Sequence, residues 1–114
     1  MNNVHHALSD VIFIAVNYSY VKIAKADILF VEAAGGYVEI YTTDRKYQHT
    51  IHLKQFSGQL GDDSFVRVSR KHVVNLKHID SIRGNVLYIQ KNEILIGKQY
   101  RSYFLDFLPI IRTK

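Results

Sequence analysis

The stretch ILFVEAAGGYVEIYT, residues 28–42, places two runs of β-branched and aromatic residues on either side of Gly35-Gly36. Alternation of apolar and polar positions is typical of strands, and a glycine pair between two such runs is typical of a tight hairpin turn. The stretch therefore predicts two antiparallel strands, over residues 28–33 and 37–42.

The same period-two pattern continues along most of the chain in both directions. Short breaks such as Asn17 and Gly84-Asn85 separate the runs, which is the spacing of hairpins rather than of strand–helix–strand units. The ten predicted strands span residues 11–16, 20–24, 28–33, 37–42, 45–50, 65–68, 73–75, 79–83, 86–89 and 93–96. We therefore predict a mostly β fold of antiparallel strands.

Two stretches follow a helical period instead. Leu53, Phe56 and Leu60 form one apolar stripe that ends at Gly61, which predicts a short connecting helix over residues 51–60. A second face predicts a C-terminal helix from about residue 98 to residue 108, ended by Pro109. Its members are Tyr100, Tyr103, Phe104, Phe107, Leu108 and Ile111. We expect this aromatic face to pack on the sheet.

Length and composition indicate one folded domain. The chain has 114 residues, 47% of them hydrophobic, and no cysteine, and a chain of this size builds one ordinary core. It shows neither a secretory leader nor an apolar run long enough to span a bilayer, so we expect a cytoplasmic protein without membrane association. The predicted organisation is a disordered or linker-like segment over residues 1–10, the domain over 11–108 and a C-terminal tail over 109–114.

Positive charge is concentrated in one third of the chain. Residues 1–64 carry five Lys or Arg against seven Asp or Glu, whereas residues 65–101 carry eight against two. A basic excess confined to one part of a folded domain predicts a polyanionic partner, and acidic lipid headgroups would satisfy the same electrostatics as nucleic acid. The charge gathers at residues 69–72, with the sequence SRKH, and at residues 98–101, with the sequence KQYR.

No combination of residues predicts an enzyme or a metal site. His72 and His78 are six residues apart without carboxylates at ligand spacing, and the other four histidines lie in the N-terminal segment or at a strand–helix boundary. Ser69, His72 and Asp80 lack the nucleophile elbow of a hydrolase, and the glycine pair is too short for a phosphate-binding loop. Glu32 and Glu39 flank the glycine pair and are expected to face solvent. We therefore expect no catalytic residues, no metal and no cofactor.

Three motifs occur in the order and spacing of one bacterial family. Residues 26–38, ADILFVEAAGGYV, are similar to D-I-x-Y/F-I/V/L-E-A-x-G-N-Y-V/T. Residues 65–75, FVRVSRKHVVN, are similar to F-x-R-V-H-R-S-Y/F-I/V-V-N, and residues 94–100, ILIGKQY, to I-P-I/V-S/G-x-x-Y/F. The chain thus resembles the LytTR DNA-binding domain, the output module of LytR-like and AlgR-like response regulators. Gly36, Ser69, Lys71 and His72 depart from the family pattern, which bears on the DNA target rather than on the fold.

The resemblance implies that loops, rather than a recognition helix, enter the major groove of DNA. The implied DNA-binding residues are Gly36, Tyr37, Val38, Ser69, Arg70, Lys71, Lys98, Gln99 and Arg101. Arginine can read guanine with two hydrogen bonds, lysine suits a phosphate and glutamine can pair with adenine. We therefore assign base reading to Arg70 and Gln99 and phosphate binding to Lys71, and we expect Arg67 to be a structural or phosphate-facing strand residue.

The implied function is sequence-specific binding of double-stranded DNA in the regulation of transcription by a two-component system. Family members bind imperfect direct repeats, so a second copy would lie beside the first on DNA. A receiver domain, controlled by a sensor kinase, would precede the module in a full-length regulator. Two alternatives stay open, namely a β-module that stacks single-stranded nucleic acid on its eight Tyr and six Phe, and an interaction domain for an acidic partner.

Overall fold

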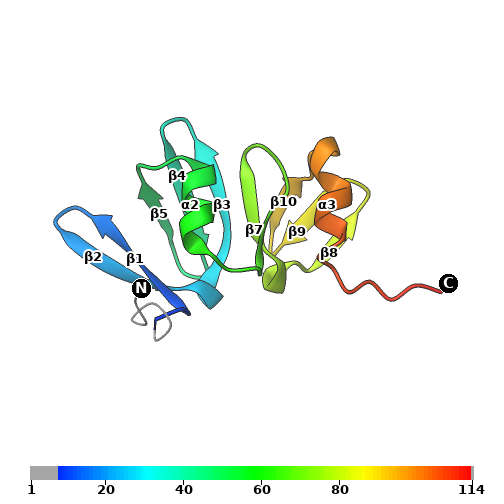
Figure 1. The fold of residues 1–114 in the computed structure, drawn as a ribbon, viewed down its shortest axis with the longest axis horizontal. Helices are drawn as coiled ribbons and strands as arrows, with labels where there is room; N and C mark the ends of the chain where they lie inside the picture. The colour runs from blue at the N-terminus through cyan, green and yellow to red at the C-terminus, as the bar shows by residue number, and fades with distance from the viewer. Residues whose placement is uncertain (1–7, 114) are drawn as a thin grey trace.

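Ten strands form three antiparallel sheets in the computed structural model, which describes residues 8–113 (Figure 1). The central sheet has five strands in the order β5-β4-β3-β7-β6, and β1 with β2 and β10-β9-β8 form two smaller sheets. The mostly β, antiparallel fold predicted from the sequence is confirmed.

Every predicted strand is present, with ends that differ from the prediction by at most two residues. The strands are β1 (Val11–Val16), β2 (Ser19–Ala24), β3 (Ile28–Ala34), β4 (Tyr37–Thr42), β5 (Lys46–His49), β6 (Phe65–Arg67), β7 (His72–Asn75), β8 (Ser81–Arg83), β9 (Val86–Ile89) and β10 (Asn92–Leu95). The helices are α2 (Leu53–Leu60) and α3 (Arg101–Leu105), with single 3-10 turns η1 (Lys25–Asp27), η2 (Leu76–His78) and η3 (Lys98–Tyr100). The predicted connecting helix corresponds to α2.

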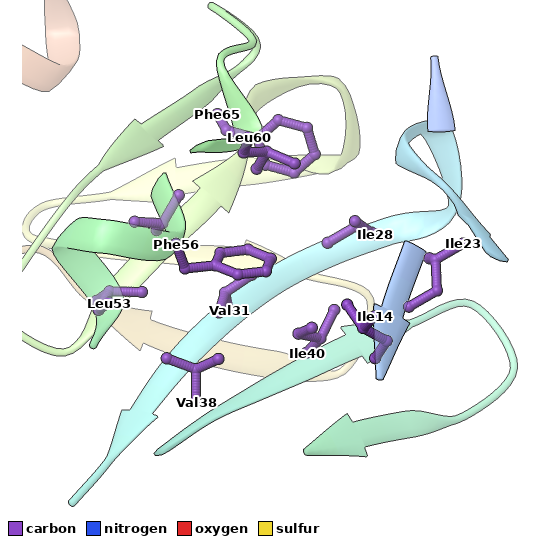
Figure 2. Close-up of a cluster of buried hydrophobic side chains, with 11 residues drawn as sticks. Ile14, Ile23, Ile28, Val31, Val38, Ile40, Leu53, Phe56, Leu60 and Phe65 are labelled. Carbon is purple, nitrogen blue, oxygen red and sulfur yellow. The ribbon is translucent and has the colours of Figure 1, made fainter. Parts of the chain in front are cut away.

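The central sheet buries both of its faces, because successive residues of a strand point to opposite sides. On one face, Val31 of β3 and Val73 of β7 pack with α2 and with the β1–β2 hairpin. Figure 2 shows this cluster, with Phe56 of α2 close to Val31. On the other face, Phe30 and Val74 pack with the β8–β10 sheet and α3. The two cores therefore share the central sheet.

Asn75 joins the end of β7 to the start of β3 from within the core. The side chain is 1% exposed, and its Nδ2 donates to the carbonyl oxygen of Ile28 at 2.9 Å. Its Oδ1 accepts a hydrogen bond from the backbone N–H of Lys77 at 3.0 Å. Buried amide groups require such partners, which accounts for a buried polar residue at the end of β7.

The C-terminal helix is shorter than predicted, and less of its apolar face is buried. Regular helical structure ends at Leu105, and only a few residues of so short a helix can point toward the sheet. Phe104 is completely buried, whereas Tyr103 is 54% and Ile111 is 98% exposed. Tyr103 and Phe107 instead pack edge to face on each other, with ring centroids 5.1 Å apart. The expectation that the whole aromatic face packs on the sheet is wrong.

Of the two predicted terminal segments, residues 8–10 lie beside the β1–β2 hairpin and residues 109–113 extend from the opposite side of the molecule (Figure 1). Most of the predicted linker-like segment falls outside the described residues, and residues 8–10 form a turn before β1. Residues 109–113 continue from α3 without regular structure. Within the described part of the chain, no helix has the length and apolar character needed to cross a membrane.

Candidate nucleic-acid interface

Three segments lie along one edge of the molecule, which is the upper edge in Figure 1. We name them the glycine turn (residues 35–38, between β3 and β4), the basic corner (residues 69–72, between β6 and β7) and the helix start (residues 97–101). The N–H of Ala33 donates to the carbonyl of Lys71 at 2.8 Å, and the N–H of Gly97 donates to the carbonyl of Val68 at 2.7 Å. Backbone hydrogen bonds therefore join the basic corner to β3, which leads into the glycine turn, and join the residue before the corner to the helix start.

The backbone of the basic corner is held by the side chain of Ser69 within it and by that of Arg67, at the end of β6. Arg67 donates from Nε to the carbonyl of Ser69 and from Nη2 to the carbonyl of Arg70, both at 2.7 Å. The Ser69 hydroxyl accepts from the N–H groups of Lys71 at 3.2 Å and His72 at 3.1 Å. Arg67 is thus structural, as expected, and Ser69 uses its hydroxyl to hold the turn.

Arg70 and Lys71 extend from this corner, and both are exposed. Among residues 8–113 the Arg70 guanidinium has no ion-pair partner. The Lys71 ammonium lies 3.7 Å from Oε2 of Glu32, and its side chain remains 65% exposed. The corner therefore presents one free guanidinium and one weakly paired ammonium on a rigid backbone, which suits guanine and phosphate recognition respectively.

A half-buried polar cluster lies behind the corner. The Tyr41 hydroxyl oxygen is 3.2 Å from Oε1 of both Glu32 and Glu39, which are cross-strand neighbours. Burial, with the charges of Glu32 and Glu39, raises the pKa of Tyr41 to about 12. His72 Nδ1 lies 3.3 Å from the Ser69 hydroxyl, and burial lowers the pKa of His72 below its ordinary value. The side chains of Glu32 and Glu39 are 26% and 20% exposed and belong to this network. The expectation that both simply face solvent is therefore wrong.

The helix start packs closely against the basic corner. A Cβ atom at Gly97 would lie 3.0 Å from the Tyr100 ring and 3.5 Å from both Ser69 Cα and the Val68 carbonyl oxygen. Gly97 has an ordinary φ of −64°, so glycine is needed for close approach and not for an unusual turn. Lys98 and Gln99 are exposed beside it. The corner and the helix start border an open groove of about 400 Å³.

Comparison with known proteins identifies the family. Residues 18–108 match the family model of the LytTr DNA-binding domain. This chain belongs to the LytTR family. The LytTR domain is 33% identical over 97 residues to the sensory transduction protein LytR of Staphylococcus haemolyticus. The aligned residues make up 82% of this chain and 38% of that protein. It is 28% identical over 84 residues to the transcriptional regulatory protein LytR of Staphylococcus aureus strain N315, 71% of this chain and 34% of that protein.

A solved structure also shares the LytTR fold. The LytTr DNA-binding domain of a putative methyl-accepting/DNA response regulator from Bacillus cereus superposes with a TM-score of 0.77 at 21% sequence identity. The match covers 89% of this chain and 98% of that one. By contrast, this chain spans little more than a third of the length of the LytR proteins, 38% and 34%. The resemblance inferred from three motifs is confirmed for the family and for the fold.

In addition to Ser69, two of the expected contact residues of the LytTR domain have other roles. Val38 is completely buried in the first core, so its side chain supports the glycine turn and cannot contact DNA. Arg101 donates from Nε at 3.3 Å and from Nη2 at 3.0 Å to the carbonyl of Gly84. Arg101 therefore ties the helix start to the β8–β9 turn, which sequence reasoning had not connected with the site. Gly36 and Tyr37 remain in the glycine turn, exposed and half-buried respectively.

Nothing in the described residues suggests metal chemistry. No group of three or more His, Cys, Asp or Glu side chains between residues 8 and 113 is arranged to hold a metal ion. The chemistry that the edge can supply is hydrogen bonding and positive charge, from Arg70, Lys71, Lys98 and Gln99. These groups fit phosphate oxygens and base edges.

Proposed function

We propose that this LytTR domain binds double-stranded DNA sequence-specifically by placing the basic corner and the helix start in the major groove. The observation that carries the proposal is the hydrogen bond from Gly97 N–H to the Val68 carbonyl, 2.7 Å long. It holds two exposed cationic segments together that are almost thirty residues apart in sequence. Hydrogen bonds from Arg67 to the backbone of the corner support the proposal further, because side chains that read base edges must be held in position by their surroundings.

The proposal divides the contacts by their chemistry. Arg70 and Gln99 read base edges, because a guanidinium and an amide can each form two hydrogen bonds to one base. Lys71 and Lys98 bind phosphates and set the position of the domain on the duplex. The glycine turn, with Gly36 and Tyr37, approaches the flanking backbone.

The proposed biological role is regulation of transcription as the output domain of a response regulator. The similar Staphylococcus proteins are named as a transcriptional regulatory and a sensory transduction protein, and each is much longer than this chain. We infer a receiver domain, controlled by a sensor kinase, in the full regulator, and a cytoplasmic location. We also infer a DNA site of imperfect direct repeats, occupied by two copies of the domain.

The domain is expected to bind duplex DNA more tightly than single strands, with strong salt dependence. If about five phosphates are neutralised, the plot of log binding constant against log salt concentration should have a slope of about −4 to −5. Fluorescence anisotropy of matched duplex and single-stranded probes over a salt series measures both quantities. A slope near zero would contradict the proposal, and tighter binding to the single strand would favour the base-stacking alternative instead.

Gln99→Ala is expected to change DNA recognition without changing stability. Because Gln99 is exposed, the melting temperature should stay within about 2 °C of the parent. Preference should weaken at one base pair of a site selected from a random duplex pool. Lys98→Ala is the matched control, since it should weaken all sequences alike. If Gln99→Ala binds every single-base variant as the parent does, the helix start reads no base.

A further inference from the structure

Glu32 places a carboxylate directly behind the basic corner. It lies opposite His72 in the β3–β7 register, and its Oε2 is 3.7 Å from Lys71 Nζ and 3.7 Å from His72 Nε2. Its Oε1 is 3.2 Å from the Tyr41 hydroxyl. A carboxylate anchored here opposes the approach of DNA phosphates to the corner, so its presence needs an explanation.

Lys71 is the cation that balances this carboxylate near neutral pH. Burial lowers the pKa of His72, and the Lys71 charge acts in the same direction while Glu32 opposes both. The imidazole is therefore mostly neutral above pH 7, and it contributes hydrogen bonding rather than charge. The Lys71 side chain is 65% exposed, whereas that of Glu32 is 26% exposed. The ammonium can leave the pair by rotating its own side chain, but the carboxylate stays in place.

We propose that Glu32 is a positioning residue that sets DNA affinity through Lys71. Glu32 holds the Lys71 ammonium in the free domain, and Lys71 exchanges this carboxylate for a DNA phosphate on binding. The inference rests on the proposed function, because it requires the basic corner to face DNA. The exchange lowers affinity for every duplex sequence equally, since it involves no base. It keeps the attraction of the corner for arbitrary DNA weak and leaves discrimination to Arg70 and Gln99.

Glu39 offers a matched control for removing this charge. It lies directly across from Glu32 in the β3–β4 register and is the same 3.2 Å from the Tyr41 hydroxyl. Its ion-pair partner, however, is Lys46 of β5 at 3.4 Å and not a residue of the corner. Glu32→Gln and Glu39→Gln therefore remove one negative charge each from the same network, and only the first releases Lys71.

The test measures affinity of the parent, Glu32→Gln, Glu39→Gln, Lys71→Ala and the double variant Glu32→Gln/Lys71→Ala for a random-sequence duplex near pH 7.5. Glu32→Gln should tighten binding about two- to five-fold, the range expected for an exposed ion pair. It should also steepen the salt slope by up to about one, because Glu32 no longer takes up a cation when Lys71 leaves. Glu39→Gln should tighten binding by a smaller factor. In the Lys71→Ala background, Glu32→Gln should tighten binding only as much as Glu39→Gln does in the parent.

Equal tightening by the two Gln variants would overturn the inference, as would an undiminished effect of Glu32→Gln in the Lys71→Ala background. A parent that shows no salt-dependent duplex binding would overturn both this inference and the proposed function. Melting curves check the fold of each variant. If Glu32→Gln does not fold, Glu32→Asp replaces it, because the shorter side chain withdraws the carboxylate from Lys71, and it should tighten binding in the same direction by a smaller factor.

Discussion

Phe104→Ala is expected to lower the free energy of unfolding of this LytTR domain by about 3–5 kcal/mol. The ring is completely buried in the second core, among residues such as Leu87 and Ile96. Because α3 has only five residues, no other side chain of the helix is buried as deeply. Truncation leaves a cavity between the helix and the sheet. Urea denaturation measures the loss of unfolding free energy, and an unchanged slope of that free energy against urea concentration shows that the variant unfolds in the same way as the parent.

Tyr103→Ala is the control for this experiment. Tyr103 precedes Phe104 in the same helix but is 54% exposed, and it contacts Phe107 rather than the sheet. Its removal should lower the unfolding free energy by less than about 1 kcal/mol, as for most surface changes. Equal losses from the two variants would show that α3 packs differently from the arrangement described. DNA affinity of the folded Tyr103→Ala variant should be unchanged.

Arg70→Ala is expected to weaken binding to a selected DNA site by about 1–3 kcal/mol and to relax preference at one or two base pairs. The Arg70 carbonyl is held by Arg67 Nη2 at 2.7 Å, a contact that involves only the backbone of Arg70. The corner should therefore keep its shape when the side chain is removed, and the loss reports base reading. Binding to a panel of single-base variants of the selected site measures it.

Lys71→Ala is the comparison for base reading. Because lysine binds phosphate as a point charge, its loss should weaken binding to all base variants alike and reduce the magnitude of the salt slope by at most about one. The loss should be smaller than for Arg70→Ala, because in the exchange proposed above Lys71 gives up its ion pair with Glu32 to bind a phosphate. Equal losses of affinity from both variants, uniform over all base variants, would show that the corner contacts only the DNA backbone and reads no base.

The strands were predictable because their signals are local. The apolar run of β3 includes Phe30 and Val31, which pack into different cores, as expected for a strand that is buried on both sides and whose successive side chains point to opposite faces. Left-handed backbone at Asn17, with φ 58°, and at Gly84, with φ 62°, matches residues that tolerate it. Each of these features depends on only a few neighbouring residues.

The C-terminal helix was predicted less well because periodicity states only which residues share a face. Tyr103 and Phe104 are neighbours in sequence with similar rings, but only Phe104 reaches the β8–β10 sheet. Burial of a face also depends on how long the helix continues and on what lies opposite it. Leu108 still packs against the second core, but the chain beyond it extends away from the sheet (Figure 1), and Ile111 is 98% exposed.

By itself, the sequence determined the antiparallel β fold, the LytTR family and the positions of the cationic segments, because strand period, turn residues and local charge are properties of short stretches. Tertiary structure alone decided which of their cations the protein itself holds. Arg67 and Arg101 donate to backbone carbonyls, whereas the Arg70 guanidinium has no ion-pair partner among residues 8–113. The partnership of Glu32 with Lys71 likewise arises across paired strands, between residues 39 positions apart, where charge and spacing along the chain carry no information about contact.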